Sequence, residues 1–98
     1  MYDVRFTKQA EKDAVLIERA GLKGKTAELI RIVKTDPFKN PPPYEALRGD
    51  RKGAYSRRIN KQHRFVYEVL PDTENLADAN GMPYEGFVKI IRMWTHYE

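Results

Sequence analysis

A carboxylate, three arginines and an imidazole between residues 45 and 96 of this chain are the residue types that metal-free RNA cleavage needs. They are Glu45, Arg48, Arg58, Arg64 and His96. In that reaction the ribose 2′-OH loses a proton as it attacks phosphorus, negative charge gathers on the phosphorane, and the departing 5′-oxygen gains a proton. A carboxylate, guanidinium groups and an imidazole can serve these three steps in that order. Each residue can equally be an ordinary solvated surface charge, so the residue types alone leave both interpretations open.

The positive charge of the chain comes from one segment. The 98 residues include 18 Lys and Arg against 14 Asp and Glu, a net charge of +4. Residues 48–64 contain seven positive residues and one acidic residue, Asp50, so this segment is +6 and the remainder is −2. A concentrated basic segment suits a polyanionic partner such as RNA.

Several classes of protein and site are excluded by composition. The chain has no cysteine, which rules out disulfides, thiolate metal ligands and thiol nucleophiles. No apolar run approaches the roughly 20 residues of a membrane span, and the N-terminal MYDVRFTKQ lacks the apolar core of a signal peptide. We therefore expect a soluble, cytoplasmic protein without a membrane partner, folded as one domain over residues 1–98.

The elements that would position these residues begin with a strand and two helices. Apolar and polar residues alternate over residues 2–6, which predicts a short strand. Thr7 then stands at an N-cap position before a helical pattern that stops at Gly21. A second helical pattern must end near Asp36, because Pro37 disfavours helical geometry in the residue before it. The close spacing predicts antiparallel helices joined by a tight turn.

A proline-rich connection separates the helices from the remaining strands. Residues 37–43 read PFKNPPP, which cannot form a helix or a strand ladder. It is either a rigid arm that presents Tyr44 and Glu45 or a plain connector, and these residues alone favour the connector.

Three further strands are expected, over residues 54–60, 63–70 and 87–97, with a tight hairpin between the first two. The order strand, helix, helix, three strands predicts an α+β fold. In it, two antiparallel helices pack on one face of a twisted, mainly antiparallel sheet.

Side-chain alternation assigns residues to the two faces of this sheet. Bulky apolar residues of the 63–70 strand should face the helices, namely Phe65, Tyr67 and Val69. The opposite, open face then receives Arg64, Val66 and Glu68. On the 54–60 strand Arg57 shares a face with Tyr55 and Ile59, and Arg58 shares the other with Ser56. His96 shares a face with Trp94, but alternation does not say which face that is.

Three segments resemble the signature of the YoeB/Txe toxins of the RelE/ParE superfamily. They are EALR at residues 45–48, GAYSRRI at residues 53–59 and HRFVY at residues 63–67. A terminal His96-Tyr97 pair completes the pattern. The match is close over residues 44–70 and clear at the C-terminus, whereas the two helices agree in order and length rather than in sequence. The resemblance implies a RelE-like microbial RNase fold.

The resemblance also implies a role for each matching residue. Glu45 would be the general base on the 2′-OH, Arg64 would stabilise the phosphorane, and His96 would be the general acid to the 5′-oxygen. Tyr97 would orient or stack on the substrate. The implied phosphate-binding residues are Arg48, Lys52, Arg57 and Arg58. The products would be a 2′,3′-cyclic phosphate and a 5′-OH, formed without a metal or another cofactor.

A member of this family would be the toxin of a type II toxin–antitoxin system. It would cut messenger RNA on the ribosome and so inhibit translation. Its partners would be the ribosome, the message and a cognate antitoxin whose acidic or amphipathic segment covers the basic face or displaces the C-terminal His96-Tyr97 pair. The sequence leaves a homodimer open.

Departures from the family pattern keep other functions open. Residues 72–86 look longer than the expected turn and could reshape the mouth of the site or contact a partner. Tyr44 stands where a proline often precedes the Glu. A ParE-like relative would bind DNA gyrase without the acid–base set, and a basic RNA-binding module would bind phosphates without cutting. We interpret His63 as structural or as a hairpin-end residue, and Trp94 either as a base-stacking residue or as part of the core or its rim.

Overall fold

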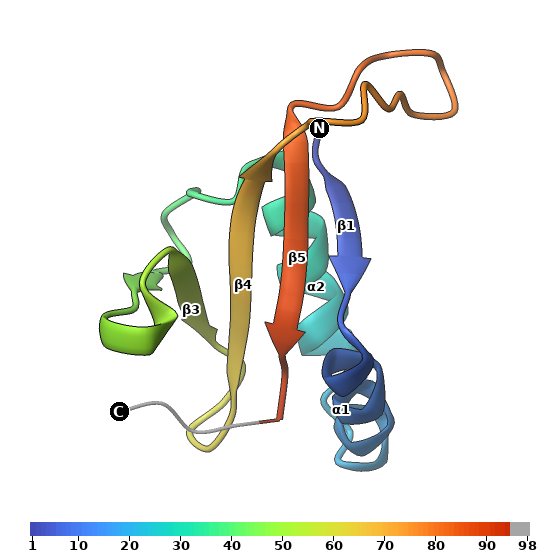
Figure 1. The fold of residues 1–98 in the computed structure, drawn as a ribbon. Helices are drawn as coiled ribbons and strands as arrows, with labels where there is room; N and C mark the ends of the chain where they lie inside the picture. The colour runs from blue at the N-terminus through green and yellow to red at the C-terminus, as the bar shows by residue number, and fades with distance from the viewer. Residues whose placement is uncertain (95–98) are drawn as a thin grey trace.

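Two helices cover one face of a mostly antiparallel sheet, as the sequence predicts (Figure 1). The sheet has five strands rather than the four expected, because Glu45–Ala46 forms an additional edge strand. The computed structural model describes residues 1–94. Strand order across the sheet is β1-β5-β4-β3-β2; β1 pairs with β5 in parallel and the other pairs are antiparallel. The elements are β1 (Asp3–Phe6), α1 (Lys8–Arg19), α2 (Lys23–Thr35), β2 (Glu45–Ala46), the 3-10 turn η1 (Gly49–Arg51), β3 (Ala54–Arg58), β4 (Arg64–Pro71) and β5 (Gly86–Arg92). No helix in this part of the chain is long and apolar enough to span a membrane.

The core lies between the helices and the central strands. From the strands, Phe65, Tyr67, Val88 and Ile90 are fully buried against apolar residues of the helices. The assignment of Phe65 and Tyr67 to the helix face is therefore confirmed, and each such side chain contributes about 1.5–3 kcal/mol through burial. Val66, expected on the open face, is also fully buried. Val66 is paired in register with Ser56 of one neighbouring strand and Arg92 of the other, beside a β-bulge. The middle of the sheet face that lacks helices is therefore inaccessible to solvent at Val66.

Local sequence signals set the helix ends. The Thr7 hydroxyl accepts a hydrogen bond from the Ala10 amide at 3.0 Å, the N-cap that the sequence predicts. Gly21 adopts a positive φ of 75° in the turn after α1, a conformation that side-chain-bearing residues rarely adopt. α2 ends at Thr35 with Asp36 as its C-cap, immediately before Pro37.

Strand β5 ends earlier than the sequence predicts, because the backbone amides after Arg92 donate hydrogen bonds to a buried carboxylate instead of to a neighbouring strand. Asp13 of α1 accepts hydrogen bonds from Arg92 Nε at 2.9 Å and from the amides of Met93 and Trp94 at 2.9 and 3.2 Å. Those amides are therefore lost to the strand ladder. Burial alone would raise the pKa of Asp13, but the hydrogen bonds, including one from Gln9, outweigh it and lower that pKa below its usual value.

The acidic arm, residues 72–85, leaves β4 at the end remote from Arg64 and returns into β5 (Figure 1). β4 has eight residues, so the arm begins roughly 25 Å from Arg64. Arg5 anchors the arm through both oxygens of Glu74, at 3.3 and 3.0 Å, and the N-terminal amine of Met1 binds Glu85 at 2.7 Å. The expectation that this segment reshapes the mouth of the site is therefore wrong.

Candidate active site

A carboxylate and a guanidinium meet on the open face of the sheet where β2, β3 and β4 lie side by side. Glu45 of β2 is in register with Ser56 of β3, and Ser56 with Val66 of β4. Arg64 opens β4 and brings its Nη2 to 3.6 Å from Oε1 of Glu45. The structure thus brings together two of the predicted catalytic residues from elements separated by a helical turn and a hairpin.

These two side chains differ in exposure in a way that suits their expected roles. The Glu45 side chain is 72% exposed, whereas that of Arg64 is 15% exposed. An exposed carboxylate can reach a substrate hydroxyl, and a largely enclosed guanidinium stays fixed where charge develops.

Arg58 completes a basic cavity around the pair. Pro43, Glu45, Arg58 and Arg64 line a cavity of about 320 Å³. Arg58 and Arg64 occupy directly opposed positions of the β3–β4 ladder, and like charges so placed repel each other. An anion between them removes that repulsion. Two guanidinium groups and one carboxylate therefore form a site with net positive charge that is suited to a phosphate.

Ser56 is a functional residue that the sequence reasoning missed. Its hydroxyl accepts a hydrogen bond from Arg64 Nε at 2.5 Å, and its side chain is fully buried. This bond fixes the guanidinium plane while Nη2 points toward Glu45. The signal was the serine within the SRRI segment, whose alternation already placed it on the same face as Arg58.

Arg57 does not belong to the phosphate-binding set, which corrects the expectation from the sequence. It is fully buried. Its Nε donates to the Tyr67 hydroxyl at 3.2 Å, its Nη2 to the Pro37 carbonyl at 3.0 Å, and its Nη1 to the Pro42 carbonyl. With three hydrogen bonds to acceptors inside the protein, Arg57 holds the proline-rich connection against the sheet. Burial raises the pKa of Tyr67 despite the opposing effect of Arg57.

The proline-rich connection is a positioned arm rather than a plain connector. The Tyr67 hydroxyl donates to the Pro37 carbonyl at 2.6 Å, next to the Arg57 contacts. Phe38, Tyr44 and Tyr55 form a ring cluster with centroids 5.1–5.9 Å apart. Aromatic pairs of this geometry add about 0.5–1.5 kcal/mol beyond burial. The arm thereby delivers Glu45 to the edge of β3.

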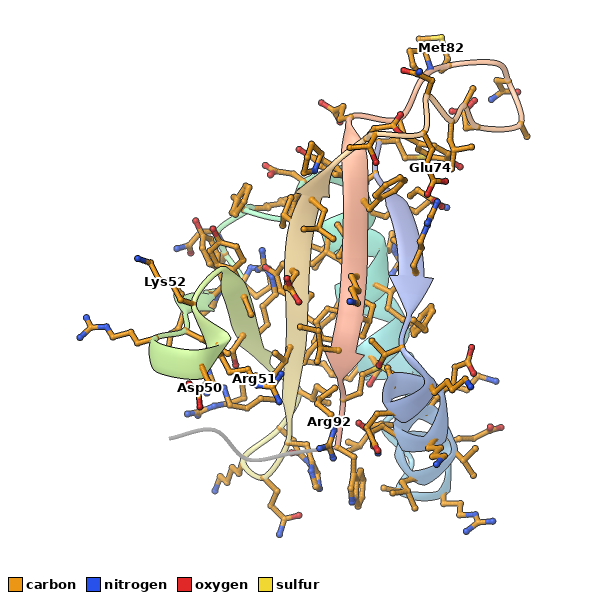
Figure 2. All side chains as sticks on the ribbon, in the orientation of Figure 1. Asp50, Arg51, Lys52, Glu74, Met82 and Arg92 are labelled. Atoms are coloured by element: carbon orange, nitrogen blue, oxygen red, sulfur yellow. The ribbon has the colours of Figure 1, made fainter. Side chains whose placement is uncertain are left out.

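The remaining predicted residues fall into two groups. Arg48 and Lys52 are exposed at the two ends of η1 and do not line the cavity; Figure 2 shows Lys52 pointing outward from that turn. The predicted general acid His96 and its neighbour Tyr97 lie outside the described residues.

His63 has the structural role that the sequence predicts. Its side chain is buried and its ring stacks on Trp94, with centroids 3.7 Å apart and an interplanar angle of 18°. Trp94 packs against the core as well, so its core or rim interpretation holds. Over residues 1–94, no group of three or more His, Asp or Glu side chains is arranged to hold a metal ion.

Comparison with known proteins gives one consistent family. A family model described as a YoeB-like toxin of bacterial type II toxin–antitoxin systems matches residues 6–97. The chain is 46% identical over 51 residues to Toxin YoeB of Streptomyces coelicolor, a match that covers 52% of this chain and 61% of that protein. Across three curated relatives it matches, the chain spans 61–63% of their length.

Solved structures are similar over nearly the whole chain. A YoeB/ParE toxin from Agrobacterium tumefaciens is 30% identical with a TM-score of 0.74, and the match covers 97% of this chain and 99% of that one. The toxin–antitoxin complex YoeB–YefM from Staphylococcus aureus, described as heterotetrameric, contains a chain that is 27% identical. Its TM-score is 0.70, with 99% of both chains covered.

Proposed function

Because the chain belongs to the family of YoeB-like toxins of bacterial type II toxin–antitoxin systems, we propose that it inhibits translation by cutting messenger RNA on the ribosome. The observation that carries the proposal is the 3.6 Å approach of the Glu45 carboxylate to Arg64 in a cavity that Arg58 also lines. A base and two phosphate-binding cations thereby surround one space large enough for a phosphate. We propose the cytoplasm as the place of action.

In the proposed reaction Glu45 takes the proton of a ribose 2′-OH. The 2′-oxygen forms a bond to phosphorus while Arg64, held by Ser56, and Arg58 stabilise the charge on the phosphorane. The bond from phosphorus to the 5′-oxygen then breaks as His96 protonates that oxygen, a role that the family resemblance supplies. The products are a 2′,3′-cyclic phosphate and a 5′-OH. The proposed reaction uses side-chain acid–base chemistry and needs no metal ion.

Other residues contribute binding rather than proton transfer. Tyr97 orients or stacks on the substrate. Arg48 and Lys52, on the turn that follows β2, add positive charge for neighbouring phosphates. Each such charge raises the salt dependence of RNA binding.

We also propose that a cognate antitoxin silences the protein. The Staphylococcus aureus relative is described as a complex with its antitoxin. The segment at residues 48–64, with a net charge of +6, offers an acidic antitoxin segment the same cations that RNA would use. Antitoxin and RNA would then compete for one surface.

A cell-free translation assay tests the proposal. We expect purified wild-type protein, freed of any bound metal by EDTA treatment and buffer exchange before the assay, to stop translation and to leave cuts in ribosome-bound message, mapped by primer extension. Glu45→Gln and His96→Ala should each slow cutting by about 10²–10⁴-fold, the typical contribution of a general acid or base. Glu74→Gln on the acidic arm is the matched control and should cut normally.

Two outcomes would contradict the proposal. Normal cutting by both Glu45→Gln and His96→Ala would remove the acid–base assignment. Inhibition of gyrase supercoiling without RNA cutting would instead indicate a ParE-like activity.

A further inference from the structure

A second basic cavity adjoins the one that holds Glu45 and Arg64. It has a volume of about 470 Å³, and its lining consists of Lys25, Pro42, Pro43, Arg58, Ile59, Asn60 and Lys61. Pro43 and Arg58 line both cavities. The two cavities are therefore neighbours, with Pro43 of the proline-rich arm and Arg58 between them.

Three cations from three different elements converge on this second cavity. Lys25 comes from α2, Arg58 from β3 and Lys61 from the β3–β4 turn, and no acidic residue lines the cavity. Within residues 1–94 none of the three forms an ion pair, whereas Arg64 in the first cavity has Glu45. Cations gathered without a counter-charge repel one another, and a bound anion removes that cost.

Contacts within the protein hold the apolar wall of this cavity in place. Arg57 donates to the Pro42 carbonyl from inside the protein, and the buried Ile59 follows Arg58 just after the end of β3. The apolar faces of Pro42, Pro43 and Ile59 thus form a firm surface next to the cations. A charged rim on an apolar wall suits a sugar–phosphate unit better than a free inorganic ion.

We propose that this cavity is a second phosphate subsite, which holds the phosphate next to the scissile one on the same RNA strand. The inference rests on the proposed ribonuclease function, because the first cavity must hold the scissile phosphate. Arg58 then touches both phosphates, and Lys25 and Lys61 neutralise the second. The substrate strand therefore runs from Glu45 past Arg58 toward the N-terminal end of α2.

Salt-dependent binding of an uncleavable RNA tests the subsite. The probe is a fluorescent 2′-O-methyl RNA heptamer, whose blocked 2′-oxygens prevent cleavage, with Kd measured over a series of NaCl concentrations. For single strands the slope of log K against log salt is about −0.7 for each phosphate neutralised. We expect the double variant Lys25→Gln/Lys61→Gln to bind more weakly and to reduce the slope by about 0.7 relative to wild type.

The control removes the same charge from elsewhere on the surface. Lys12→Gln/Lys89→Gln replaces two exposed lysines that line neither cavity and should keep the wild-type slope within error. All four lysines are exposed, so the unfolding midpoint of each variant should match wild type. Equal slopes for the two double variants, whether both unchanged or both reduced, would overturn the subsite.

The same measurement separates this inference from the proposed function. Binding of the heptamer requires no cleavage. A reduced slope in Lys25→Gln/Lys61→Gln together with a wild type that cuts no RNA would support a phosphate-binding cavity and refute the nuclease. Wild-type cutting with an unchanged slope would refute the second subsite alone.

Discussion

The two ends of β4 carry opposite charges and use them differently. At the end that begins with Arg64, residues 48–64 have a net charge of +6; at the other end, residues 72–86 contain four acidic residues and no basic ones. Figure 2 shows Glu74 and Met82 on the acidic arm, far from Asp50, Arg51 and Lys52 at the basic end.

The acidic arm uses its charges to hold its own shape. Glu74 pairs with Arg5 and Glu85 with the N-terminal amine, and Asp78 accepts from the amides of Asn80 and Met82 within the arm. At the basic end, over the described part of the chain, Arg58 and Lys61 have no ion-pair partner and Arg64 has a single one, an exposed carboxylate. The charges of the acidic arm are thus engaged within the protein, whereas the cations without a protein partner are those available to a ligand.

The largest expected effect on RNA cutting distinguishes the basic end of β4 from the acidic arm at its other end. Arg64→Ala should reduce the rate of RNA cutting by about 10²–10³-fold, because a guanidinium aimed at the phosphorane is lost. The acidic arm can be removed instead: Pro71 and Gly86 are paired in register, so an Asn-Gly turn can replace residues 72–85. This shortened protein should cut at the wild-type rate, and a comparable loss of rate in both proteins would refute the division.

The next effect compares neighbours that point to opposite faces of β3. Arg57→Met should reduce the free energy of unfolding by about 3 kcal/mol, because it removes three hydrogen bonds of a buried side chain and leaves the Pro42 carbonyl without the donor that Arg57 supplies. Arg58→Met should change stability by less than about 0.5 kcal/mol but weaken RNA binding. Urea unfolding and RNA titration measure both properties. Equal stability of the two variants would contradict the assigned roles.

A smaller effect is expected at Asp13, the buried carboxylate that accepts hydrogen bonds from the two amides after β5. Asp13→Asn should cost about 2 kcal/mol near neutral pH, because its amide cannot accept every hydrogen bond that the carboxylate accepts. The pKa of Asp13 is lowered in the folded protein, so its stabilisation is complete above about pH 4 and is lost as the pH falls toward the folded pKa. Urea unfolding at about pH 7 and about pH 3 should therefore show a smaller gap between the two proteins in acid. A gap that widens in acid would contradict this sign.

The smallest effect is expected at the acidic arm. Glu74→Gln removes an exposed ion pair with Arg5, and such pairs contribute little because water and salt screen them. The thermal unfolding midpoint and the cutting rate should both stay within error of wild type. A clear drop in either would show that this charge matters beyond the arm.

Much of this arrangement could be predicted from short-range patterns. Alternation placed Phe65 and Tyr67 against the helices and Arg64 on the open face, and Thr7 and Pro37 marked helix ends. The two-residue strand β2 was missed because Glu45 and Ala46 follow prolines and carry no alternating pattern.

Long-range contacts account for the errors. Alternation put Arg57 on one face with Tyr55 and Ile59 without saying which face that is, and the family resemblance implied phosphate binding. Hydrogen bonds to carbonyls 15 and 20 residues away instead hold Arg57 inside the protein. The early end of β5 depends on Asp13, 80 residues from Met93, which no local pattern reveals. The role of Ser56 likewise appears only when β3 and β4 are paired.

A single-atom change in the substrate tests the central claim most directly, namely that Glu45 activates a ribose 2′-OH beside Arg64. Message carrying 2′-deoxyribose only at the mapped cut site should resist wild-type protein, whereas all-ribose message should yield fragments with a 2′,3′-cyclic phosphate and a 5′-OH. Cutting of the deoxy-substituted message at the same position and rate would contradict the account, because no 2′-oxygen would then be needed.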